Sequence, residues 1–147
     1  MEIAVVIVDD EEVDRMITRK RFERSDYAEV FTTFREVENG DTFLENVRKD
    51  GSLWGDQVLV LMDVNMPGRS GFETISELQT LIERGEVTDG GVVMIFTSSE
   101  NSTDMMRAKA ASLVTDYLIK PLTEQDISRV FNMFASMRRD GLQQRAV

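Results

Sequence analysis

The chain has 147 residues with 27 acidic and 17 basic side chains, a formal net charge of -10, and neither cysteine nor histidine. This composition excludes disulfides and thiolate metal sites, removes the usual general base and zinc ligand, and disfavours binding to nucleic acid or anionic lipid. One domain is expected from the length. The apolar runs are too short to span a membrane and the first residues lack a secretory signal, so we expect a cytoplasmic protein.

The first predicted strand is the apolar run Ile3–Val8, which ends at the acidic pair Asp9 and Asp10. A helix is predicted next from three apolar residues at helical spacing: Val13, Met16 and Ile17. Residues 29–34 then read as the second strand and residues 41–49 as a short helix. The inward face of that short helix is expected to hold Phe43, Leu44 and Val47.

A loop is predicted at residues 50–57, with Trp54 as its partly buried anchor. The run Val58–Met62 has no polar break and therefore predicts a strand buried on both faces. Asp63 stands where this strand leaves the core, and Asn, Pro and Gly residues follow it as a turn. Asp63 is thus either a reactive group at the carboxyl end of a strand or an ordinary residue that begins a turn.

Ser70 and Glu73 form a capping box that opens the next helix, and Gly85 is expected to end it. Its apolar stripe is predicted to be Phe72, Ile75, Leu78 and Ile82. Residues 92–96 form another apolar strand, closed by Thr97. The helix after it is predicted from Met106, Ala110 and Leu113.

The last predicted strand is Val114–Ile119, which Lys120 and Pro121 terminate. Thr123 and Asp126 resemble a capping box for the final helix, which we expect to end at residues 138–141. Its inward side chains are predicted to be Ile127, Val130, Phe131 and Phe134. Five strand–helix pairs of this kind predict an α/β fold, a doubly wound parallel sheet in the order 2-1-3-4-5.

Such a sheet brings the ends of four predicted strands to one edge, and with them Asp9, Asp10, Asp63, Thr97 and Lys120. Three carboxylates a few ångströms apart would repel one another by about 4 kcal/mol per pair at an effective dielectric constant near 20. They therefore require a cation. A set of oxygen ligands suits Mg²⁺, with Mn²⁺ as a second possibility, and does not suit zinc.

A divalent metal beside a free carboxylate, an ammonium group and a hydroxyl is a setting for phosphoryl transfer. Asp63 would be the carboxylate nucleophile, with Lys120 and Thr97 holding phosphoryl oxygens. Each residue also has an ordinary interpretation. Lys120 could be a surface lysine, Thr97 a helix cap and Asp9 a complement to a helix dipole, but their joint occurrence favours the functional hypothesis.

Four motifs together resemble those of the receiver domains of two-component response regulators: Val8-Asp9-Asp10, Met62-Asp63-Val64-Asn65-Met66-Pro67 with Gly71, Phe96-Thr97-Ser98, and Tyr117-Leu118-Ile119-Lys120-Pro121. The resemblance covers nearly the whole chain. It implies a single stand-alone receiver over residues 1–147, similar to chemotaxis regulators, with a flavodoxin-like (βα)5 fold and no output domain.

By the same resemblance, Asp63 accepts a phosphoryl group from a histidine kinase or phosphotransfer protein. Asp10 and Asp63 would bind Mg²⁺ directly and Asp9 through water, with the backbone carbonyl of Asn65 as a further ligand. Thr97 and Lys120 match the switch hydroxyl and the phosphate-binding lysine. The resemblance also implies that Tyr117 is the movable aromatic residue and that the peptide bond from Lys120 to Pro121 is cis.

We therefore expect a phosphoacceptor that changes its affinity for a downstream protein target, as a monomer or a phosphorylation-dependent homodimer. Its only catalysis would be its own phosphorylation from phosphodonors and its own dephosphorylation. The alternatives are a Mg²⁺-dependent phosphohydrolase with an aspartyl-phosphate intermediate and an interaction module that is never phosphorylated. Against the hydrolase, the sequence shows neither a cap domain nor an Asp-x-Asp pair around Asp63. Against the interaction module, the acidic set is complete.

Overall fold

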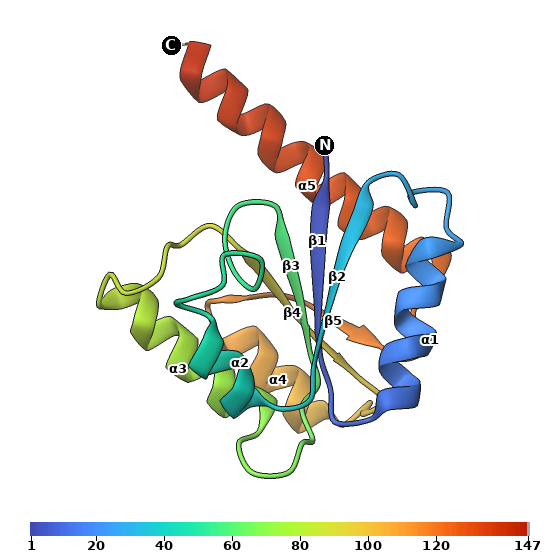
Figure 1. The fold of residues 1–147 in the computed structure, drawn as a ribbon, viewed down its shortest axis with the longest axis vertical. Coiled ribbons are helices and arrows are strands. Elements are labelled where there is room, and N and C mark those ends of the chain that lie inside the picture. Colours follow the sequence, from blue (N-terminus) through green and yellow to red (C-terminus); the bar gives the residue numbers. More distant parts are fainter. Residues whose placement is uncertain (147) are drawn as a thin grey trace.

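The computed structural model describes residues 1–146 as a five-stranded parallel sheet with helices on both faces (Figure 1). The strands are β1 (Ile3–Val8), β2 (Phe31–Val37), β3 (Val58–Met62), β4 (Val92–Thr97) and β5 (Val114–Ile119). The helices are α1 (Glu12–Glu23), α2 (Gly40–Asn46), α3 (Gly71–Glu83), α4 (Ser102–Ala110) and α5 (Glu124–Ala146). The strand order is β2-β1-β3-β4-β5, which confirms the predicted doubly wound fold.

Each face of the sheet has its own apolar core because successive strand residues point to opposite sides. On one face, β-strand side chains such as Val6 and Val60 pack with those of α2, α3 and α4. On the other face, Ile7 and Leu61 pack with Phe22 of α1 and with the first half of α5. Figure 1 shows the same division, with α1 and α5 on one side of the sheet and the other three helices opposite.

The register of the strands places their carboxyl ends together. Val8 pairs with Met62, so that Asp9 and Asp63 follow on neighbouring strands. The backbone N–H of Asp63 donates to the carbonyl oxygen of Val8 at 3.0 Å. Two strands further along the sheet, the N–H of Lys120 donates to the carbonyl oxygen of Thr97 at 2.9 Å. These bonds hold the residues of the edge in a fixed order.

The first helix forms where the sequence predicts it, but its predicted apolar residues face solvent. Val13, Met16 and Ile17 are 59%, 46% and 41% exposed. The buried face of α1 consists instead of Arg15, Thr18 and Phe22. Phe22 fixes the orientation of α1, because its side chain fills the core between the helix and the sheet. The centroid of its ring lies 4.8 Å from that of Phe31. The helix therefore presents an apolar surface outward, beside the carboxyl edge.

The second strand and the short helix after it differ from their predicted bounds. The strand was expected at residues 29–34 but runs over Phe31–Val37, because the N–H groups of Val30 and Phe31 both donate to Tyr27 in a preceding turn. The helix was expected to reach residue 49 but ends at Asn46, followed by turns. Phe43 and Val47 are buried as predicted, and Leu44 is partly buried.

The third and fourth helices correct two predicted faces. Leu81, rather than Ile82, completes the buried stripe of α3, and Ile82 is only partly buried. In α4 the buried residue is Ala108, whereas Met106 is 70% exposed. Leu113 lies beyond the end of α4. The predicted cap of α3 is confirmed, since the hydroxyl of Ser70 accepts from the N–H of Glu73 at 3.2 Å.

The last helix is longer than expected. Thr123 and Asp126 form the predicted reciprocal cap, with bonds of 3.0 and 3.1 Å between each side chain and the other's N–H. The predicted stop at residues 138–141 is wrong, because the helical backbone continues to Ala146. A glycine inside a helix costs only about 1 kcal/mol relative to alanine, and the residues after Gly141 are mostly strong helix formers. Figure 1 shows this end of α5 extending past the sheet.

Two long loops meet at the amino end of the sheet, opposite the acidic residues. Trp54 is 4% exposed, and its indole N–H donates to the carbonyl oxygen of Thr88 at 2.7 Å. Its ring lies so close to Gly91 that a Cβ there would come within 2.6 Å of it. The prediction of Trp54 as a loop anchor is confirmed.

Among residues 1–146, no helix combines the length and the apolar character that crossing a membrane requires.

Candidate functional site

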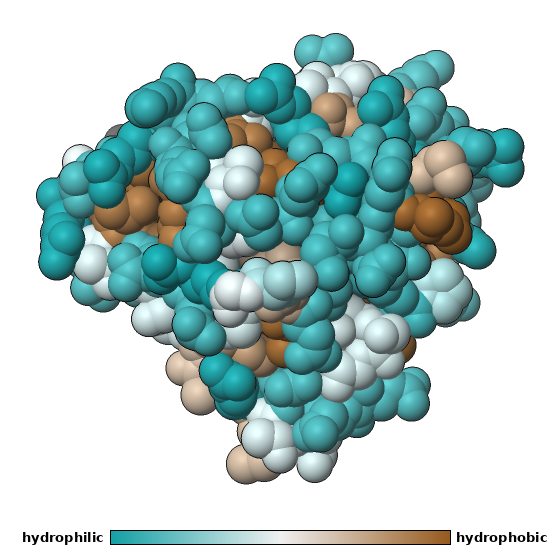
Figure 2. Space-filling view, turned by 60° about the horizontal axis from the view of Figure 1, so that its bottom comes forward, coloured by the Kyte–Doolittle hydropathy of each residue, from teal (hydrophilic) through white to brown (hydrophobic). Residues whose placement is uncertain are grey.

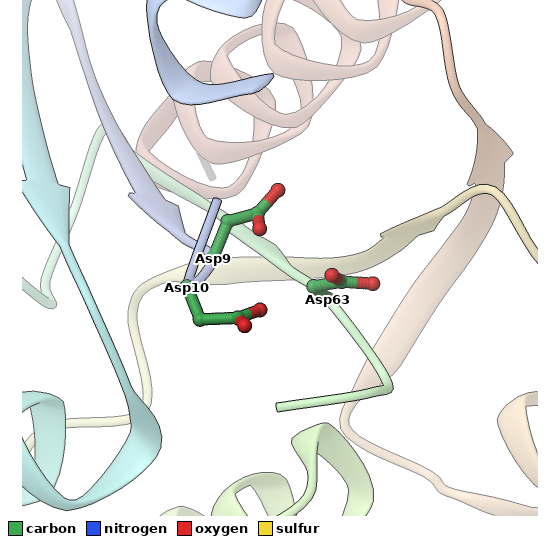
Figure 3. A group of neighbouring side chains, drawn as sticks. All are labelled: Asp9, Asp10 and Asp63. Carbon is green, nitrogen blue, oxygen red and sulfur yellow. The ribbon is translucent and has the colours of Figure 1, made fainter. Parts of the chain in front are cut away.

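The carboxylates of Asp9, Asp10 and Asp63 converge at the carboxyl edge of the sheet. Each offers a ligand oxygen, and these oxygens all lie within 4.8 Å of one another. Figure 3 shows the three side chains side by side at this edge, Asp9 and Asp10 following β1 and Asp63 following β3. Asp9 and Asp63 are buried, and Asp10 is more accessible. The predicted convergence of the strand ends is thus present in the structure.

Asp63 is a buried carboxylate in a strongly charged environment. Burial raises its pKa, the Lys120 ammonium group opposes this rise, and the negative charge of Asp9 adds to it. Hydrogen bonding from the Thr97 hydroxyl and from the N–H of Val64 also lowers the pKa of Asp63, as Lys120 does. The pKa of Asp63 nevertheless lies above its usual value, because the effect of burial is the largest. The surroundings therefore disfavour the ionised carboxylate in the absence of a further cation.

Lys120 reaches into this pocket from the end of β5 and contacts several carboxylates. Its Nζ lies 2.5 Å from Oδ2 of Asp9 and 3.5 Å from Oδ2 of Asp63. Burial works to lower the pKa of Lys120, but the hydrogen bond to Asp9 and the charges of Asp63 and Asp9 outweigh it, so that the pKa lies above its usual value. The lysine is therefore a fixed positive charge beside Asp63.

Thr97 and Tyr117 are connected through the loop after β4. The Thr97 hydroxyl is buried and accepts from the N–H of Ser99 at 3.3 Å. The Tyr117 hydroxyl donates to the carbonyl oxygen of Ser99 at 2.7 Å. Both side chains thus bond to the backbone of the same residue. These two hydrogen bonds connect Thr97 and Tyr117 through the backbone of Ser99.

The loop after β3 keeps the chain close to Asp63. Gly71, the first residue of α3, donates to the carbonyl oxygen of Val64 at 3.0 Å. A Cβ at Gly71 would lie 2.0 Å from the carbonyl oxygen of Asp63, so only glycine fits there without movement. Asn65 lies in this loop with its side chain exposed. The peptide bond between Lys120 and Pro121, on the other side of the pocket, is cis as the resemblance implies.

Two residues of α1 belong to the surroundings of the site, although sequence reasoning did not single them out. Arg15 is 7% exposed, and its guanidinium donates to the backbone carbonyl oxygen of Asp9 at 2.6 Å and to Glu36 at 3.3 Å. Asp14 lies 3.1 Å from Nζ of Lys120. Arg15 shares the helical spacing of Thr18 and Phe22, which would have placed it on the buried face, but nothing in the sequence links Asp14 to Lys120.

Comparison with known proteins agrees with this fold. The family model of the response regulator receiver domain matches residues 5–132. The two-component response regulator ORR3 of Oryza sativa subsp. indica is 30% identical over 128 residues, which are 87% of each chain. The chemotaxis protein CheY of Halobacterium salinarum is 28% identical over 123 residues, or 84% of this chain and 88% of that protein.

A solved two-component response regulator from Cytophaga hutchinsonii has the same fold, with a TM-score of 0.78 and 20% identity over 92% of this chain and 99% of its own. The chain is thus a parallel α/β signalling domain with an acidic pocket at its sheet edge. It belongs to the response regulator receiver domain family of two-component signalling. That residues 1–147 act without an output domain stays a prediction.

The donor set of the pocket fits a hard divalent cation. The three clustered ligand groups are carboxylates, and oxygen ligands of this kind suit Mg²⁺ or Mn²⁺. Lys120 supplies one positive charge beside these three carboxylates. The residues present are therefore able to hold such an ion.

Proposed function

We propose that Asp63 is the phosphoacceptor of a two-component phosphorelay. Its carboxylate oxygen would attack the phosphorus atom of a phosphohistidine on a histidine kinase or phosphotransfer protein. A P–O bond forms, the P–N bond breaks with its electron pair going to the imidazole nitrogen, and an aspartyl phosphate results. The observation that carries the proposal is the buried Asp63 carboxylate, which lies 3.5 Å from Nζ of Lys120 and clusters with Asp9 and Asp10 at the end of β1.

In this proposal Asp9, Asp10 and Asp63 hold Mg²⁺ or Mn²⁺, with the backbone carbonyl of Asn65 as a further ligand. When bound, the ion supplies positive charge that offsets the carboxylates and the incoming phosphoryl oxygens. Lys120 would bind one phosphoryl oxygen, since its Nζ is already 3.5 Å from Asp63. The Thr97 hydroxyl would bind another, because it lies close enough to Asp63 to lower the pKa of that carboxyl.

The switch would run from Thr97 to the outer surface of α4, β5 and α5. A phosphoryl group adds about -1.5 to -2 charges and strong acceptor oxygens, which would draw the Thr97 hydroxyl inward. Because Thr97 and Tyr117 both bond to Ser99, this movement would rearrange Tyr117. Met105 and Met106 are 37% and 70% exposed on α4, on the surface that the downstream protein would contact.

The exposed apolar face of α1 favours a protein as phosphodonor over a small-molecule substrate. Val13, Met16 and Ile17 lie in the first half of α1, which follows the acidic residues at the end of β1, and are exposed enough to pack against a partner. Figure 2 shows this end of the molecule as mainly hydrophilic, with separate apolar patches. Two cavities, of about 390 and 550 Å³, lie between α1 and α5 and between α3 and α4, and neither is lined by the three clustered carboxylates. This arrangement gives little support to the phosphohydrolase alternative.

The test is incubation with Mg²⁺ and acetyl phosphate, followed by intact-mass measurement. We expect a phosphoryl adduct on the wild type, none on Asp63→Asn, and a normal adduct on Asp89→Asn, a control in an exposed loop. Absence of the adduct from the wild type, or its persistence in Asp63→Asn, would contradict the proposal. Steady multiple turnover of a small phosphomonoester would favour the hydrolase.

A further inference from the structure

Lys120 is shared among three carboxylates, and one of them comes from outside the strand ends. Its Nζ lies 2.5 Å from Asp9, 3.1 Å from Asp14 and 3.5 Å from Asp63. Asp14 stands in the first turn of α1. The ammonium group is therefore closer to the two carboxylates on the α1 side of the pocket than to the residue that we propose to be phosphorylated.

Asp14 differs from Asp9 in that it is not a candidate metal ligand. Asp9 is one of the three clustered carboxylates that could hold a metal ion, whereas Asp14 is outside that cluster. The Asp14 side chain is 41% exposed and that of Lys120 only 12%. Asp14 thus contacts the lysine from the solvent side of the pocket, and replacing it leaves the candidate metal ligands in place.

We propose that Asp14 is a positioning residue that holds Lys120 on the α1 side and competes with a phosphoryl group on Asp63 for it. This inference rests on the proposed function of Asp63. The ammonium group has three N–H donors, and each one that bonds to Asp14 is not directed at the phosphoryl oxygens. The carboxylate of Asp14 also repels an anionic phosphoryl group nearby. Both effects weaken the phosphorylated state in the wild type.

Asp14→Asn should therefore bind a phosphoryl analogue more tightly. An ion pair as exposed as this one contributes up to about 1 kcal/mol. We therefore expect the affinity for the analogue to rise roughly two- to fivefold. Asp14→Glu keeps the carboxylate and should stay near the wild type. The affinity for Mg²⁺ alone should change less than that for the analogue, because the clustered ligands are intact.

The matched control is Glu12→Gln, which removes the same charge from the same turn. Glu12 is exposed, and two residues along a helix rotate a side chain by about 200°, so it points away from the direction of Asp14. If general electrostatics at the start of α1 governed affinity, Glu12→Gln would match Asp14→Asn. If the contact with Lys120 governs it, Glu12→Gln should stay close to the wild type.

The experiment is a titration of each full-length variant with beryllofluoride in the presence of Mg²⁺, followed by ¹⁹F NMR, with thermal unfolding to check folding. Tighter binding by Asp14→Asn, with Asp14→Glu and Glu12→Gln near the wild type, is the expected result. Equal affinities for Asp14→Asn and Glu12→Gln, or weaker binding by Asp14→Asn, overturn the inference. A wild type that binds no beryllofluoride and forms no phosphoryl adduct would instead overturn the proposed function itself.

Discussion

Replacing Gly71 with alanine tests how the start of α3 holds the end of β3. The added Cβ would lie 2.0 Å from the carbonyl oxygen of Asp63, 2.9 Å from its carbonyl carbon and 3.1 Å from Cα of Val64. All three neighbours are backbone atoms, so no side-chain rotation relieves the clash. The N–H of Gly71 is also bonded to Val64, which resists a simple shift of the helix.

The oxygen of Asp63 would have to move by about 1.4 Å to reach the ordinary contact distance of 3.4 Å. Overpacking of this kind costs about 1–3 kcal/mol of stability. Displacing a reacting group by about 1 Å lowers rates by as much as a hundredfold. We therefore expect Gly71→Ala to be less stable by about 1–3 kcal/mol and to acquire the phosphoryl adduct much more slowly.

Urea denaturation followed by circular dichroism measures the first effect, and the time course of adduct formation measures the second. Gly51→Ala is the matched control, because a Cβ at Gly51 would meet nothing within 4 Å. A Gly71→Ala protein within about 0.5 kcal/mol of the control, phosphorylated at the normal rate, would refute the reasoning.

Three further predictions concern Asp63, Trp54 and Tyr117. Because burial raises the pKa of Asp63 above its value in the unfolded chain, ionisation of this carboxyl lowers stability as pH rises through the two pKa values. Asp63→Asn should therefore be more stable than the wild type at neutral pH without Mg²⁺. Urea melts should show that this gain in the free energy of unfolding shrinks as the pH falls toward 3.8. A gain that grows on acidification would contradict the prediction. Trp54→Phe loses the bond to Thr88 and should cost about 1–2 kcal/mol in urea melts without slowing adduct formation. Tyr117→Phe loses the bond to Ser99 and should speed amide hydrogen exchange at residues 98–101, whereas unchanged exchange would show that this bond does not order the loop.

Three of the five strands could be predicted closely from sequence because their apolar runs have sharp ends. Val58–Met62 and Val114–Ile119 begin and end where the residue pattern indicates. The edge strand β2 was less predictable, because its burial pattern has exposed residues at most interior positions and a turn takes up Val30. The apolar spacing on α1 indicated a helix correctly but gave the wrong face, since an exposed apolar face and a core face follow the same period.

The end of α5 could not be read from Gly141, because a single glycine is too weak a stop signal when helix-forming residues follow it. The convergence of Asp9, Asp63 and Lys120 was predictable, because the parallel sheet alone brings these strand ends together. The contact between Asp14 and Lys120 was not, since it depends on how closely α1 packs beside the edge.

The most direct measurement locates the phosphoryl group itself. After reaction with acetyl phosphate and Mg²⁺, borohydride reduction converts an aspartyl phosphate to homoserine, which peptide mass spectrometry assigns to a position. We predict homoserine at position 63, and its loss when Mg²⁺ is chelated during phosphorylation. Homoserine at another aspartate, or an equal yield without the metal, would contradict the account.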